Sequence, residues 1–396
     1  MTPPSQLDRR TIIGAAVFLF LGSIAFFQAL TPLRFMGGDT ALYLSEYGNT
    51  LADDRLIFHV REPGAVWLLQ LIFLFLKSFS ESHTINPALL AKGFEHLSTI
   101  CGGIFVLGAA AFANLLTPRP KAKLATFALS CAGIYFWLFM GHIELYAPLL
   151  MALMLLFLAV LAVTHSGANP AWAWGALIVA ATMHRVALVY LPAFYFLLPL
   201  PDGLKHLRPI PKKFLMQGTI ATLAILLPHI LFLAFYLGQW EQVRRPLPME
   251  LTNWLPELIT PLTQGQLDYV RANSQMGSFH LFTLGSLAHW QHLSIFMLTS
   301  APLGWIVILL YGKRLRHADN FQKFLITATA FGWAWAFVWH PHRSYGDWDL
   351  FCHPGLATNL LAATLLVPRA INGACRATFP QVENLSESPP PGPTAT

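Results

Sequence analysis

Apolar stretches of nearly bilayer-spanning length recur along this chain and constrain its fold more than any other feature. Of its 396 residues, 55% are hydrophobic and 11% are charged, and a membrane-spanning helix needs about 20 predominantly apolar residues. A membrane barrel would instead show alternating segments of about ten residues. The sequence therefore predicts an all-α fold, a polytopic transmembrane helical bundle. The ten predicted spans lie at about 12–30, 97–116, 124–140, 145–164, 171–183, 186–200, 214–236, 291–311, 324–340 and 354–368.

One further apolar run, residues 63–79, is short for a span and begins with Pro63-Gly64. If this run spanned the membrane, the basic loop 119–123 would face outward. If it lies in the interface or re-enters, the basic loops all face the cytoplasm, as the positive-inside rule favours. We therefore predict an interfacial or re-entrant helix inside a long outer loop, residues 31–96.

This topology divides the chain into two membrane regions and a tail. The first region covers residues 1–236, beginning with an uncleaved first span. The second covers residues 237–368 and carries an outer loop, 238–290, and a polar segment, 340–353. The Pro- and Ser-rich stretch 369–396 is predicted to be a disordered cytoplasmic tail. The sequence shows no internal repeat, which argues against a transporter built from two matched halves.

The polar segment between His340 and His353 is the strongest chemical feature of the sequence. It holds three His, two Asp and one Arg, and ionisable groups close to a membrane indicate a functional site. Three other inter-span segments on the same predicted face also carry ionisable groups, and a shared site is the economical interpretation. The candidate residues are Asp39, Glu62, His142, Glu144, His184, Arg185, His342, Arg343, Asp347 and Asp349.

Several of these residues also have a purely structural interpretation. Asp39 and Glu62 each precede a predicted helix and are candidate N-caps, and Arg185 is a candidate for snorkelling to the interface. His142 and Glu144 are two positions apart, so they would point about 200° apart on a helix. They can share a site only if the backbone of the turn that contains both residues is non-helical. Of Asp347 and Asp349, one is expected to face the site while the other caps the last span.

A metal site is an alternative for the polar segment. The side chains of His340, His342, His353 and the two Asp residues are ligand types that Zn²⁺ or Mn²⁺ accepts. Their spacing matches no zinc signature, and Pro341 discourages His340 and His342 from sharing one helix face. No cofactor is firmly predicted, and a divalent metal remains an open possibility.

The arrangement resembles the GT-C superfamily of polytopic membrane glycosyltransferases, which take sugars from polyprenyl-phosphate carriers. The resemblance rests on an acidic motif after the first span (Gly38-Asp39-Thr40), a Pro-led apolar helix (Glu62-Pro63-Gly64 through Phe79) and a second polar motif (Gly141 to Tyr146). It covers about the first 200 residues. Thr40 stands where many members carry a second acidic residue, so the motifs do not identify a branch.

The resemblance implies a chemistry for these positions. Asp39 would act as general base on an acceptor hydroxyl, with Glu144 as a second catalytic carboxylate. The leaving group would be an anionic lipid phosphate, which His184, Arg185, His342 and Arg343 would stabilise. One direct displacement would invert the sugar's anomeric centre. Glu62, His142, Asp347 and Asp349 would complete the donor phosphate and sugar site.

These inferences predict a cell-envelope enzyme in the bacterial plasma (inner) membrane, with its active site on the extracytoplasmic side. Its partners would be the bilayer, a polyprenyl-phosphate-linked sugar and an acceptor glycan, lipid or protein that the sequence does not specify. The alternatives are a transporter or flippase, and another lipid-phosphate transferase or phosphatase. The sequence has no basic stripe interleaved with aromatic residues, so we expect no nucleic-acid partner.

Overall fold

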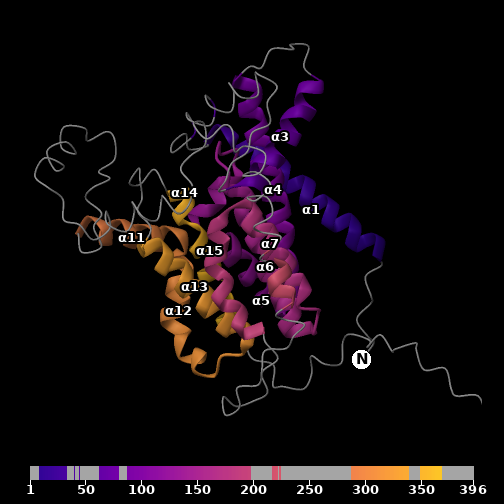
Figure 1. The fold of residues 1–396 in the computed structure, drawn as a ribbon. Coiled ribbons are helices and arrows are strands. Elements are labelled where there is room, and N and C mark those ends of the chain that lie inside the picture. The colour runs from indigo at the N-terminus through magenta and orange to yellow at the C-terminus, as the bar shows by residue number, and fades with distance from the viewer. Residues whose placement is uncertain are drawn as a thin grey trace, which may run out of the picture.

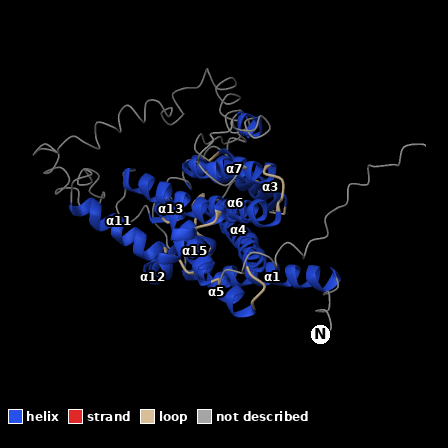
Figure 2. Cartoon of the chain, turned by 90° about the horizontal axis from the view of Figure 1, so that it is seen from below, coloured by secondary structure: helices blue, strands red, loops and turns tan. Residues whose placement is uncertain are grey.

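The computed structural model describes residues 9–33, 40, 44, 62–79, 87–197, 216–221, 223, 287–338 and 348–367. Within these residues the chain forms helices and no strand (Figure 2). The elements are α1 Arg9–Leu30, η1 Thr31–Leu33, α3 Pro63–Ser78, α4 Pro87–Leu116, α5 Pro120–Cys131, η2 Ile134–Phe139, α6 Tyr146–Ser166, α7 Ala171–Met183, η3 Arg185–Leu197, α11 Leu287–Ser300, α12 Pro302–Tyr311, η6 Gly312–His317, α13 Asn320–Val338, α14 Trp348–Phe351 and α15 His353–Leu366.

Within the described residues, three helical segments are long and apolar enough to cross a membrane. They cover Arg10–Leu33, Ala88–Leu116 and Tyr146–Ser166. A fourth candidate consists of His289–Ser300 and Pro302–His317, which are bent by 87° where they meet. A helical membrane protein therefore fits the described part of the chain, while the count of ten spans stays a prediction.

Where the structure describes the predicted spans, their interior differs from continuous α-helix at three places. The run 124–140 is α-helical only to Cys131 and continues as the 3₁₀ helix η2. The run 186–200 is described as far as Leu197, where it forms the 3₁₀ helix η3, which contains Pro192 and so lacks one backbone N–H donor. The run 291–311 breaks at Ala301, because Pro302 begins a new helix there.

The helix α4 lies at the centre of the first region and packs against α1, α3, α5 and α6 (Figure 1). It begins ten residues earlier than the span predicted at 97–116. The additional turns pack against α3, where Gly93 lies beside Leu69. The helix α3 also packs against α7 and exposes Trp67, Leu71 and Phe75. A short helix with one exposed apolar face fits the predicted interfacial segment.

Among the described residues, the larger of two hydrophobic clusters runs through both predicted regions. It includes Phe105 of α4, Phe157 of α6, Phe324 of α13 and Leu360 of α15. The helix α6 lies in its middle, between α4 and α7. Because α6 begins at Tyr146 and ends at Ser166, it defines two ends of the bundle. The end near Tyr146 is called the site end below.

Candidate functional site

Five ionisable side chains that the sequence singled out are buried in the structure. Their exposed fractions are 2% for Glu62, 2% for His142, 3% for Glu144, 7% for His184 and 5% for Asp349. They come from the start of α3, the turn before α6, the end of α7 and the short helix α14. Segments almost 290 residues apart in sequence, from Glu62 to Asp349, thus contribute to contacts at the site end.

The turn before α6 holds two of these residues in a non-helical backbone. Gly141 has φ +77°, a left-handed conformation that glycine adopts readily. A Cβ there would lie 2.7 Å from the Thr31 Cγ2 atom. The Gly141 N–H donates to Ser98 Oγ at 3.2 Å, and that hydroxyl donates to Leu138 O. The turn is non-helical at residues 141–145, which is the condition under which His142 and Glu144 can share a site.

His142 and Asp349 are direct neighbours. The His142 Nε2 atom lies 3.3 Å from Asp349 Oδ2, while Asp349 Oδ1 accepts the Leu350 N–H at 2.8 Å. The Trp348 ring lies 5.5 Å from the His142 ring, centroid to centroid. Asp349 therefore faces His142; Asp347, the other acid of the predicted pair, lies outside the described residues.

Glu62 and His184 form a second pair. Glu62 occupies the N-cap position of α3, but its side chain makes no capping hydrogen bond. Its Oε1 atom instead lies 3.2 Å from His184 Nε2. The Val186 N–H donates to His184 Nδ1 at 3.0 Å, so Nδ1 carries no proton. His184 therefore accepts a hydrogen bond with Nδ1 and presents Nε2 to Glu62.

Aromatic side chains lie beside the second pair. The Tyr146 ring lies 5.4 Å from the His184 ring. Farther along η3, the hydroxyl of Tyr190 lies 2.6 Å from His353 Nδ1. His353 is fully buried, its Nε2 atom has no hydrogen-bond partner, and its ring lies 5.1 Å from that of Trp335. Sequence reasoning missed Tyr190, because it sits inside an apolar run with no polar neighbour.

Arg185 is the only other predicted site residue that lies in the described part of the chain. Arg185 is half-buried and opens η3 directly after His184. Asp39, His342, Arg343 and Asp347 lie outside the described residues, as does His340. Thr40, which follows Asp39 in the chain, is buried and donates to the Ile143 carbonyl at 3.4 Å. That hydrogen bond joins the first acidic motif to the turn between His142 and Glu144.

We compared the chain with protein-family models, curated proteins and solved structures. None of them matches it.

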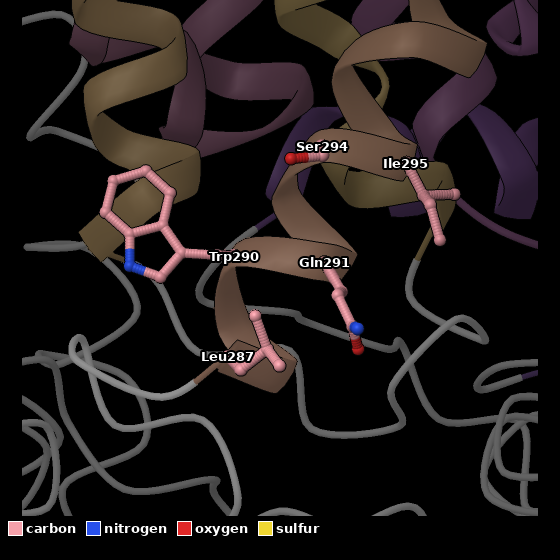
Figure 3. A pocket seen from close by; sticks show the side chains of 5 residues that line it. All are labelled: Leu287, Trp290, Gln291, Ser294 and Ile295. Atoms are coloured by element: carbon pink, nitrogen blue, oxygen red, sulfur yellow. The ribbon is translucent and has the colours of Figure 1, made fainter.

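A surface pocket of about 590 Å³ lies elsewhere, along α11 (Figure 3). All its lining side chains come from that single helix, so no groups from different elements converge there. None of the buried ionisable residues lines it. The lining residues are Leu287, Trp290, Gln291, Ser294 and Ile295.

The buried cluster offers both proton-accepting and ligand-binding groups. The Glu62 carboxylate contacts the His184 imidazole, and the Asp349 carboxylate accepts a backbone N–H. Ligand atoms of His142, Glu144 and Asp349 all lie within 4.8 Å of one another, close enough to share a metal ion. The arrangement suits acid–base chemistry and the binding of a charged ligand at the edge of an apolar bundle.

Proposed function

We propose that this protein is a membrane glycosyltransferase that moves a sugar from a polyprenyl-phosphate carrier to an acceptor, with inversion, on the extracytoplasmic face of a bacterial plasma membrane. The observation that best supports this proposal is that five buried ionisable residues lie at one end of an apolar helical bundle. They are Glu62, His142, Glu144, His184 and Asp349. Buried ionisable groups are costly in such a bundle, and this cost is understandable at a reactive site.

The proposed reaction is a single displacement at the anomeric carbon. The acceptor hydroxyl gives its proton to the Asp39 carboxylate while its oxygen forms a bond to that carbon. The bond from the carbon to the carrier phosphate oxygen breaks, and polyprenyl phosphate leaves with the electron pair. The hydrogen bond from Thr40, the next residue, to the turn that carries Glu144 supports a role for both carboxylates in one site.

The proposed roles of the other residues follow from their charge. Arg185 is next to His184 in the chain, and a guanidinium suits the leaving phosphate. His342 and Arg343 are assigned to the same phosphate on the sequence argument alone. The apolar outer surface of α3 gives a prenyl chain a route to this end of the bundle.

The test is transfer from a polyprenyl-phosphate sugar in membranes that contain either the wild-type chain or Asp39→Asn. We expect the wild type to release polyprenyl phosphate and the variant to lose about 100-fold or more of this rate, as loss of general base catalysis implies. Undiminished transfer by Asp39→Asn would refute the base assignment. Phosphate release without sugar transfer would instead favour a lipid phosphatase.

A matched control uses a histidine at the other end of α6. His165 is exposed near the C-terminus of that helix, so His165→Gln should transfer sugar at the wild-type rate. Cysteine accessibility separates the enzyme from a transporter. Single cysteines at the site end should react from the outside only, whereas labelling from both faces would favour a transporter.

A further inference from the structure

We infer that His142, Glu144 and Asp349 form a binding site for a divalent cation of the Zn²⁺ or Mn²⁺ type. The role of this ion in catalysis rests on the proposed function, but its binding does not. This ligand set differs from the group within the segment 340–353 that the sequence suggested. It joins two residues of the turn before α6 to one residue of α14.

The geometry of the three side chains supports a shared ion. Two ligands at about 2.05 Å from a tetrahedral metal lie about 3.3–3.4 Å apart. The distance from His142 Nε2 to Asp349 Oδ2 is 3.3 Å, longer than the roughly 2.7–2.9 Å of a charge-assisted hydrogen bond. The third ligand atom, from Glu144, lies within 4.8 Å of both. Small rotations of the Glu144 side chain would complete a three-ligand face.

The surroundings also orient the ligands as a metal site requires. The Leu350 N–H holds Asp349 Oδ1 at 2.8 Å, which leaves Oδ2 turned toward His142. Trp348 packs beside the His142 ring, and the hydrogen bond of Gly141 to Ser98 fixes the turn that carries His142. Such supporting contacts tune the affinity of metal ligands.

The ligand types select among cations. One imidazole with two carboxylates suits Zn²⁺ or Mn²⁺ better than Mg²⁺ or Ca²⁺, which prefer oxygen ligands alone. The carboxylates of Glu144 and Asp349, at 3% and 5% exposure, would balance the charge of a divalent ion. Three protein ligands leave at least one coordination position open for water or an anionic ligand.

The experiment measures metal binding without any sugar donor. The purified full-length chain is treated with chelator and dialysed, and then titrated calorimetrically with Zn²⁺, Mn²⁺ and Mg²⁺. Bound metal is counted by elemental analysis after gel filtration. We expect one Zn²⁺ or Mn²⁺ per chain and much weaker Mg²⁺ binding. His142→Gln, Glu144→Gln and Asp349→Asn should each weaken binding by more than the roughly 10–100-fold typical of outer-shell partners.

Two variants with similar chemical changes serve as controls. Glu62→Gln removes a buried carboxylate that contacts His184 and lies outside the group of His142, Glu144 and Asp349. His165→Gln changes an exposed histidine. Both should keep one equivalent of metal. Retention of metal in all three ligand variants would overturn the proposed site, and would identify the ion as adventitious.

The wild-type chain alone also decides the question if a variant fails to fold. Saturating Zn²⁺ or Mn²⁺ should raise its melting temperature, because a ligand that binds only the folded state stabilises it. No heat, no retained metal and no thermal shift in the wild type would overturn the inference. Metal binding without sugar transfer would leave this site standing and remove the proposed function. Chelator-insensitive transfer by a metal-free chain would leave the proposed function standing and would show that the bound ion takes no part in transfer.

Discussion

The two ends of α6 differ in how deeply the ionisable side chains near them are buried. At the site end, Glu62, His142, Glu144, His184 and Asp349 are all at most 7% exposed and contact one another across separate elements. At the opposite end, the basic residues of the connections are mostly exposed. These are Arg119, Lys121, Lys313, Arg314, Arg316 and His317.

Polar contacts at the opposite end serve the helix termini. Asp319 and Gln322 exchange hydrogen bonds with each other's backbone N–H at the start of α13, a reciprocal capping arrangement. Arg314 donates to the Leu365 carbonyl near the end of α15 and stacks over the Tyr311 ring. Each of these contacts has a sufficient structural explanation.

The site end has no such explanation for its buried acids. Glu62 sits at an N-cap position without capping its helix, and it contacts His184 instead. Asp349 accepts one backbone N–H with Oδ1 and directs Oδ2 at His142. Charge alone therefore does not distinguish a candidate active site from a helix terminus. Burial combined with contacts between distant segments does.

The largest effect on stability is expected at one of the two glycines that have positive φ in the described part of the chain. Gly141 and Gly167 flank α6, at φ +77° and φ +68°. An alanine in this conformation costs about 1–2 kcal/mol, and at position 141 it also meets Thr31, which adds about 1–3 kcal/mol. Gly141→Ala should therefore lower the free energy of unfolding by about 3 kcal/mol.

Gly167→Ala provides the matched measurement, because a Cβ at position 167 meets nothing within 4 Å. It should lose only about 1–2 kcal/mol. Denaturant titration of the purified proteins in detergent measures both. Equal losses would show that the turn before α6 is no more tightly held than the turn after it.

A smaller effect is expected for the two histidines. His184→Ala removes the donor to the buried Glu62 carboxylate, and a hydrogen bond to a charged group contributes about 1.5–3 kcal/mol. His165→Ala changes an exposed side chain, so it should stay within about 0.5 kcal/mol of the wild type. The same titration compares them, and similar values for the two variants would contradict the described difference between the ends.

The smallest effect is expected behind the site, at Tyr190. Tyr190→Phe keeps the ring that packs against Phe157 and removes the hydroxyl that contacts His353 Nδ1. The buried imidazole then loses its partner, at about 1–2 kcal/mol. Tyr195→Phe, on the exposed side of η3, should change the free energy of unfolding by less than about 0.5 kcal/mol. A neutral Tyr190→Phe variant would show that this contact does not stabilise the fold.

Much of the helix placement was predictable, because apolar runs between polar turns fix where buried helices lie. The breaks inside those runs were harder to predict. Pro302 marked one of them in the sequence, but the change to 3₁₀ helix after Cys131 depends on packing. Gly133 there lies so close to the Ser300 carbonyl that no Cβ would fit.

The site was predictable as a set of residues and not as a set of contacts. Ionisable residues in inter-span segments indicated Glu62, His142, Glu144, His184 and Asp349. Their pairing depends on how α3, α7 and α14 meet, which sequence spacing does not encode. Tyr190 lies in an apolar run, and only the structure places its hydroxyl against His353.

The central claim is that the buried cluster at the site end acts on a lipid-linked sugar. Its most direct test compares the wild type with the combined variant Glu62→Gln, Glu144→Gln and Asp349→Asn, once circular dichroism has established equal helicity. Mass spectrometry would follow the conversion of polyprenyl-phosphate sugar to polyprenyl phosphate and glycosylated acceptor in membranes. The account predicts conversion by the wild type and none by the variant. Full conversion by the folded variant would contradict it.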